Sequence, residues 1–124
     1  MGRRSRQRTR AAAGRGPEKL TAPAAEYRDG EGNVLVLRGS LPAGARREFS
    51  RVLAGGLDRE DAWQRAAELL FERLAVSWTI AGLEISSQKE LLGRYRMATQ
   101  AERRFVRDAL RDHVSEHFPE LPAP

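Results

Sequence analysis

The chain has 124 residues, of which 40% are apolar but only 6% aromatic, and it contains no cysteine. These values predict one small domain with a core built mainly from Leu, Ala and Val. They exclude disulfide bonds and cysteine-based metal sites. No apolar run approaches the roughly 18 residues of a membrane span, and no apolar stretch follows the basic N-terminus, so we expect a soluble intracellular protein without a secretory signal.

The net charge of +5 is concentrated at the N-terminus. Residues 1–20 hold seven of the 22 basic residues and one of the 17 acidic residues, so the rest of the chain is close to neutral. Residues 1–25 have too few apolar side chains to offset the entropy of ordering, which predicts a disordered basic arm. The arm is either a solubilising tail or a contact for nucleic acid or an acidic partner. Its candidate contact residues are Arg3, Arg4, Arg6, Arg8, Arg10 and Arg15.

The first structured element predicted is a β-hairpin within residues 26–38. The sequence "DGEGN" has turn chemistry, and the "NVLVLR" that follows is rich in strand formers. Gly30 and Gly32 lack the spacing of a phosphate-binding loop, so we interpret them as turn glycines.

Two helices follow in the predicted order, a short one within residues 40–56 and a longer amphipathic one over residues 59–75. Gly55 and Gly56 end the first helix, and Asp58 has the character of an N-cap for the second. Trp63 falls on the apolar stripe of the longer helix. It is therefore either a core residue or an exposed anchor for a partner.

The next segment, "VSWTIAGLEI" at residues 76–85, is apolar and follows no helical period. We expect Trp78 to be mostly buried against the 59–75 helix, and the rest to form a third strand or an extended packing segment. If a partner surface exists, the apolar and aromatic side chains around this segment are its best candidates. They are Trp63, Trp78, Ile80, Leu83, Ile85 and Tyr95.

Two S/T-x-x-E patterns, at residues 87–90 and 99–102, predict capping boxes that begin two further helices. The last helix is closed by Phe118 and Pro119, and residues 119–124 read as a frayed tail. The elements together predict a single α+β domain over residues 26–118. Its N-terminal β-hairpin or small sheet packs against three to four helices.

Residues with catalytic or metal-binding chemistry are few. His113 and His117 share a helix face at i, i+4, but there is no third ligand and no HExxH pattern, so we interpret them as ordinary helix residues. Ser86 and Ser87 are explained by capping, and no serine lies in a G-x-S-x-G elbow. We therefore predict no catalytic residue, no metal site, no cofactor and no enzymatic activity.

The order of these segments resembles that of the small tail assembly chaperones of long-tailed phages and related prophages. The resemblance covers roughly residues 26–118 and rests on two short patterns, "LVLRGSLPAGARREF" and "VSWTIAGL". The matching positions are Leu35, Leu37, Arg38, Leu41, Gly44, Phe49, Val76, Ser77, Trp78, Gly82 and Leu83, with Leu91, Leu92 and Tyr95 behind them.

The resemblance implies a non-enzymatic protein in the cytoplasm of the host bacterial cell. Proteins of this family bind the long helical tape measure protein, keep it soluble until tail tube subunits polymerise around it, and are absent from the finished virion. The basic arm departs from the family pattern. It leaves open the alternative of a small basic nucleic-acid-binding or structural virion protein that acts through the arm. The sequence also leaves open homo-oligomerisation and a longer frameshifted form.

Overall fold

The structure is a computed structural model that describes residues 23–55 and 58–122. The six arginines proposed as nucleic-acid contacts, and nearly all of the predicted basic arm, lie outside these residues. Within them the chain folds into one four-stranded antiparallel sheet and four helices, which confirms the predicted α+β class. The elements are, in chain order, β1 (Ala25–Arg28), β2 (Val34–Leu37), α1 (Ala43–Ala54), α2 (Arg59–Leu74), β3 (Ala75–Ile80), β4 (Leu83–Ile85), α3 (Gln88–Arg96) and α4 (Gln100–His117).

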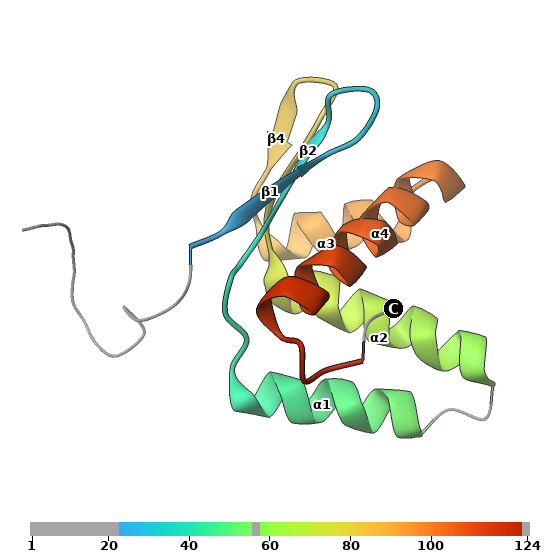
Figure 1. The fold of residues 1–124 in the computed structure, drawn as a ribbon. Coiled ribbons are helices and arrows are strands. Elements are labelled where there is room, and N and C mark those ends of the chain that lie inside the picture. The colour runs from blue at the N-terminus through green and yellow to red at the C-terminus, as the bar shows by residue number, and fades with distance from the viewer. Residues whose placement is uncertain (1–22, 56–57, 123–124) are drawn as a thin grey trace, which may run out of the picture.

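The sheet has the strand order β1-β2-β3-β4, so it consists of two hairpins joined side by side through β2 and β3. The helical pair α1 and α2 forms the connection between these two central strands. Figure 1 shows the two hairpin turns together at one end of the molecule, beyond the helices, with α1 and α2 at the opposite end. The short β1 and β4 are left as the edges of the sheet.

One face of the sheet supplies its part of the core. Tyr27, Leu35, Trp78 and Ile85 are successive partners across the four strands, and residues directly opposite one another lie on the same face. Leu35 and Trp78, on the central strands, are almost fully buried, whereas the residues at the two edges are half-buried. Burial therefore decreases from the centre of the sheet toward its edges.

The helices close over this row with a core of leucine, alanine, valine and a few aromatic rings. Phe71 of α2 is central to it, since its ring meets Trp78 edge to face at 5.7 Å and stacks on Tyr95 of α3 at 4.8 Å. Trp78 is thus buried against α2, as the sequence predicts. The core is one continuous cluster in which α1, α2, α3 and α4 all take part.

The helix starts follow their capping residues. Asp58 accepts a hydrogen bond from the amide of Glu60, and Thr99 forms a complete capping box with Glu102. At α3 only half of the predicted box is present, because Ser87 accepts from the amide of Glu90 without a reciprocal bond from the carboxylate.

Residues 76–85 form more structure than the sequence predicts. They contribute most of β3 and all of β4, joined by a tight turn at Ala81 and Gly82 whose φ angles are 53° and 82°. Two successive positive φ angles are typical of the type I′ turn that matches the twist of a hairpin. The sequence predicts a third strand or an extended packing segment here, and the structure has the third strand together with a fourth that pairs with it.

Candidate partner-binding site

The six side chains predicted to bind a partner occupy three different environments. Trp78 and Tyr95 are core residues, with 1% and 4% of their surface exposed. Trp63 is half-buried on α2, where its ring meets Phe49 of α1 at 6.4 Å, so it joins two helices. Trp63 and the three aliphatic residues of the β3–β4 hairpin are therefore the candidates that reach the surface, and Leu83 is the most exposed of them.

Those three residues, Ile80, Leu83 and Ile85, form an apolar strip on the core-facing side of the sheet. Ile80 lies directly opposite Leu83, and Ile85 is two residues further along β4 opposite Trp78, so all lie on one face. Ile80 and Ile85 are half-buried and pack against the core, whereas Leu83 is 74% exposed. The strip thus continues the core outward until it reaches solvent at the hairpin turn.

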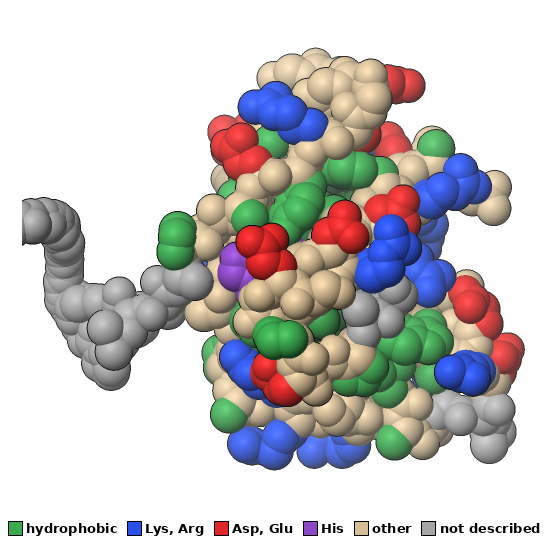
Figure 2. All heavy atoms as spheres, in the orientation of Figure 1, with side chains coloured by type: hydrophobic (Ala, Val, Ile, Leu, Met, Phe, Trp, Pro, Cys, Tyr) green, Lys and Arg blue, Asp and Glu red, His purple; other side chains and the backbone are tan. Residues whose placement is uncertain are grey.

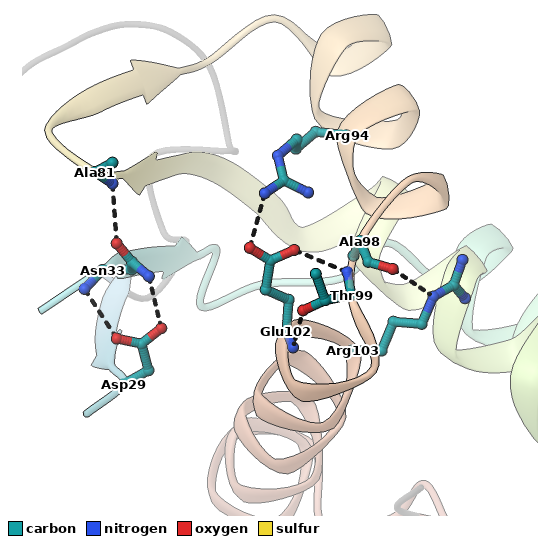
Figure 3. A network of polar contacts seen from close by, with 8 residues as sticks. All are labelled: Asp29, Asn33, Ala81, Arg94, Ala98, Thr99, Glu102 and Arg103. Carbon is teal, nitrogen blue, oxygen red and sulfur yellow. Dashed lines mark hydrogen bonds and ion pairs between the residues drawn. The ribbon is translucent and has the colours of Figure 1, made fainter. Parts of the chain in front are cut away.

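The end of the sheet that carries the strip is held in shape by a polar clasp. The amide of Ala81 donates to the side-chain oxygen of Asn33 at 3.0 Å, which ties the β3–β4 turn to the β1–β2 turn (Figure 3). The Asn33 side chain in turn donates to Asp29 at 2.9 Å. This hydrogen bond, together with three from backbone amides of the loop, lowers the pKa of the Asp29 carboxyl. Both turns are therefore fixed relative to one another.

A second network joins α3 to α4 beside Trp78. The Arg94 guanidinium lies 5.5 Å from the centre of the Trp78 ring and pairs with Glu102 at 2.8 Å. Glu102 also accepts from the amide of Thr99 at the start of α4, as Figure 3 shows. The hydrogen bond from Arg94, followed by the Thr99 amide, lowers the pKa of Glu102. The Glu102 carboxylate therefore caps α4 and also holds Arg94 over the ring of Trp78.

An open groove of about 470 Å³ lies between α2 and the exposed side of α4. We call it the arginine groove, because four of its nine lining residues are arginines of one helix. Figure 2 shows basic and acidic side chains interspersed over the face of the molecule that it draws. The groove is lined by Glu60, Gln64, Tyr95, Gln100, Arg103, Arg104, Arg107, Asp108 and Arg111.

One of the two histidines, His113, differs from the sequence-based interpretation. His113 is fully buried, its Nε2 donates to the carbonyl of Arg38 at 2.5 Å, and its Nδ1 lies 2.8 Å from the hydroxyl of Tyr27. Because a carbonyl can only accept, Nε2 carries the proton and the neutral ring accepts from the Tyr27 hydroxyl at Nδ1. Burial lowers the pKa of His113 and raises that of Tyr27. His113 is a tie between α4 and the sheet, which the sequence analysis missed because its partners lie 86 and 75 residues away.

Among residues 23–55 and 58–122, no three His, Cys, Asp or Glu side chains are grouped as metal ligands would be. None of the helices in this part of the chain is long and apolar enough to cross a membrane. No known protein family, curated protein or solved structure matches the chain.

Proposed function

We propose that this chain is a non-enzymatic, tail-assembly-chaperone-like protein that binds the tape measure protein and assists assembly of the tail tube. The observation that carries the proposal is the apolar strip. It lies in the segment with the family-like pattern, and its most exposed member, Leu83, is one of the matching positions. The proposal makes this strip the contact for an apolar stripe of a helical client.

The construction of the strip supports a contact of this kind. Ile80 and Ile85 pack against the core, and the hydrogen bond from the Ala81 amide to Asn33 fixes the turn beside them. Leu83 therefore lies on a prearranged surface. A prearranged surface loses little conformational entropy on binding. The strip is small, so a single copy would bind weakly, and several copies along one long helical client would gain affinity through multivalency.

A co-expression experiment tests the proposal. The chain is produced together with a tape measure protein as the client, and the soluble fraction of that client is measured. We expect the wild-type chain to keep the client soluble and Leu83→Ser to lose most of this effect. Met97→Ser is the matched control, because Met97 is also strongly exposed, at 82%, but lies outside the strip.

The two substitutions separate a specific contact from a general loss of surface hydrophobicity. Neither side chain is buried, so both variants should fold as the wild type does, which far-UV circular dichroism checks. The proposal fails if the wild-type chain leaves the client insoluble, or if Leu83→Ser and Met97→Ser have equal effects.

A second candidate function, binding of nucleic acid through the basic arm, is favoured by the seven basic residues within residues 1–20. Its test is the affinity for a DNA duplex as a function of salt, for the wild type and for a chain with Gln in place of the six arm arginines. We expect a steep loss of affinity with salt that the substitutions remove. An affinity that does not change with salt would refute it.

A further inference from the structure

The arginine groove has a regular arrangement of charge that neither the core nor the apolar strip explains. Arg103, Arg107 and Arg111 are spaced at i, i+4 and i+8 on α4, so they lie on one face of the helix. With a rise of about 1.5 Å per residue, successive members are about 6 Å apart along the axis. Arg104 lines the groove beside them.

The four guanidinium groups differ in how strongly they are held. Arg103 is fixed, since it donates to the carbonyls of Arg96 and Ala98 and lies 5.3 Å from the centre of the Tyr95 ring. Arg107 pairs with Glu60 at 3.1 Å, and Arg111 pairs with Asp108 at the same distance and with Asp112 at 3.8 Å. These pairs are at least partly exposed, and such pairs contribute little stability and exchange readily for other partners.

Arg104, the fourth arginine of the groove, is the one most accessible to a ligand. It is exposed, and its guanidinium forms no ion pair or hydrogen bond with another side chain in the part of the chain that the structure describes. Since Glu60 and Asp108 are the only acids among the lining residues, the four arginines give the groove an excess of two positive charges. An anionic ligand can therefore bind at Arg104 and then compete for Arg107 and Arg111.

We propose that the arginine groove binds an acidic helix of a protein client, with carboxylates spaced at i and i+4 pairing with the arginines of α4. Such carboxylates recur about every 6 Å along their own axis, which matches the repeat of the arginines. The inference rests on the proposed function for the identity of the client, and it adds that the client presents an acidic stripe as well as an apolar one.

The composition of the groove favours a protein over nucleic acid. Glu60 and Asp108 stand in its walls, and a continuous row of phosphates would be forced against them, whereas a helix can place neutral residues there. The side-chain amides of Gln64 and Gln100 can donate to carboxylates or accept from neutral polar groups. The basic arm of this chain is an unsuitable occupant, because its own positive charge opposes that of the groove.

The test measures binding of synthetic probes to the full-length chain by fluorescence anisotropy. The first probe is an alanine-rich peptide of about 20 residues, long enough to be partly helical, with Glu at every fourth position. The second is the same peptide with Gln in place of Glu, and the third is a single-stranded oligonucleotide of equal charge. The protein variants are Arg104→Glu in the groove and Arg47→Glu, an equal change of charge at an exposed site on α1 outside the groove.

We expect the Glu peptide to bind more tightly than the Gln peptide and to lose about tenfold in affinity with Arg104→Glu but less than about twofold with Arg47→Glu. Equal affinities for the two peptides, or equal effects of the two substitutions, would overturn the inference. An oligonucleotide that responds to Arg104→Glu while the Glu peptide does not would replace it with nucleic-acid binding.

The peptide assay and the co-expression experiment can fail independently, so they test the arginine groove and the proposed function separately. Co-expression with the client tests the apolar strip through Leu83, and the peptide assay requires no client. Peptide binding that depends on Arg104, together with a client that stays insoluble, would retain the groove and refute the tail-assembly role. A client kept soluble equally well by Arg104→Glu and by the wild-type chain would retain that role and refute the groove as a client site.

Discussion

Replacement of Trp78 by alanine is the strongest single test of how this fold is held together. Only 1% of the surface of Trp78 is exposed, and its strand neighbours on the same face are Leu35 and Ile85. Phe71 contacts its ring from α2, and Arg94 covers it from α3. The side chain therefore joins the sheet to two helices at once.

The contributions to the effect can be estimated separately. Truncating a buried aromatic residue to alanine costs about 3–5 kcal/mol, which includes the loss of an edge-to-face contact such as that with Phe71, about 0.5–1.5 kcal/mol. One contribution has the opposite sign. The Nε1 of Trp78 is buried without a hydrogen-bond partner in the described part of the chain, and an unsatisfied group of this kind costs about 1–3 kcal/mol, which alanine removes.

We therefore expect Trp78→Ala to lower the free energy of unfolding by about 2 kcal/mol, below the usual range for a buried aromatic residue. Trp78→Phe keeps an aromatic ring in the core and removes the unsatisfied Nε1, so it should cost only about 1 kcal/mol. Urea denaturation followed by far-UV circular dichroism measures both, because the helical signal does not depend on the tryptophan that is removed.

Two results would refute this account. A loss under about 1 kcal/mol for Trp78→Ala would mean that the ring is not part of the core and would return it to the surface as a partner contact. Equal losses for the phenylalanine and alanine variants would mean that the aromatic contact with Phe71 contributes nothing.

Two further predictions concern the ties made by α4. Because burial lowers the pKa of His113 in the folded state, its neutral form contributes stability that is complete above the unfolded pKa of about 6.5 and is lost as the pH falls toward and through the folded pKa. Urea midpoints measured against pH should fall in that window for the wild type and for His117→Gln but not for His113→Gln, and a fall of equal steepness in His113→Gln would refute the assignment. Glu102→Gln should lower the free energy of unfolding by about 1 kcal/mol at pH values above the ordinary carboxyl pKa, because it weakens the helix cap and removes the charge pair with Arg94. This difference from the wild type should disappear in acid, where the Glu102 carboxylate is protonated. A difference that persists unchanged at low pH would contradict the prediction.

The elements that the sequence predicts well are those with local signals. Asp58 and Thr99 mark the starts of α2 and α4 because a cap acts within three residues of itself. The turn at Ala81 and Gly82 was not predicted as a hairpin because alanine is uncommon where φ is positive, and the usual Asn-Gly or Asp-Gly signal is missing. What allows it is the Asn33 hydrogen bond to the Ala81 amide, from a loop 48 residues earlier.

The candidate sites likewise depend on contacts between residues far apart in the sequence. The residues of the apolar strip, Ile80, Leu83 and Ile85, could be chosen from the sequence because they are apolar. The burial of Trp78 and Tyr95 could not, because it depends on how the helices pack against the sheet. The i, i+4 spacing of Arg103, Arg107 and Arg111 is visible in the sequence. That they face a groove depends on α2, whose Glu60 approaches from 47 residues away.

The two proposed contacts, the apolar strip and the arginine groove, would place different demands on a ligand, and their combination would be selective. Leu83 can bind any apolar side chain, because contact of aliphatic groups has little directional character. On the proposal, the arginines favour a stripe of carboxylates with a matching repeat, and their positive charge disfavours a basic segment. A helix with an apolar stripe alone would bind weakly at the strip, whereas one with both stripes would gain a second contact within the same complex. Loss of either Leu83 or Arg104 should then weaken binding of the same client.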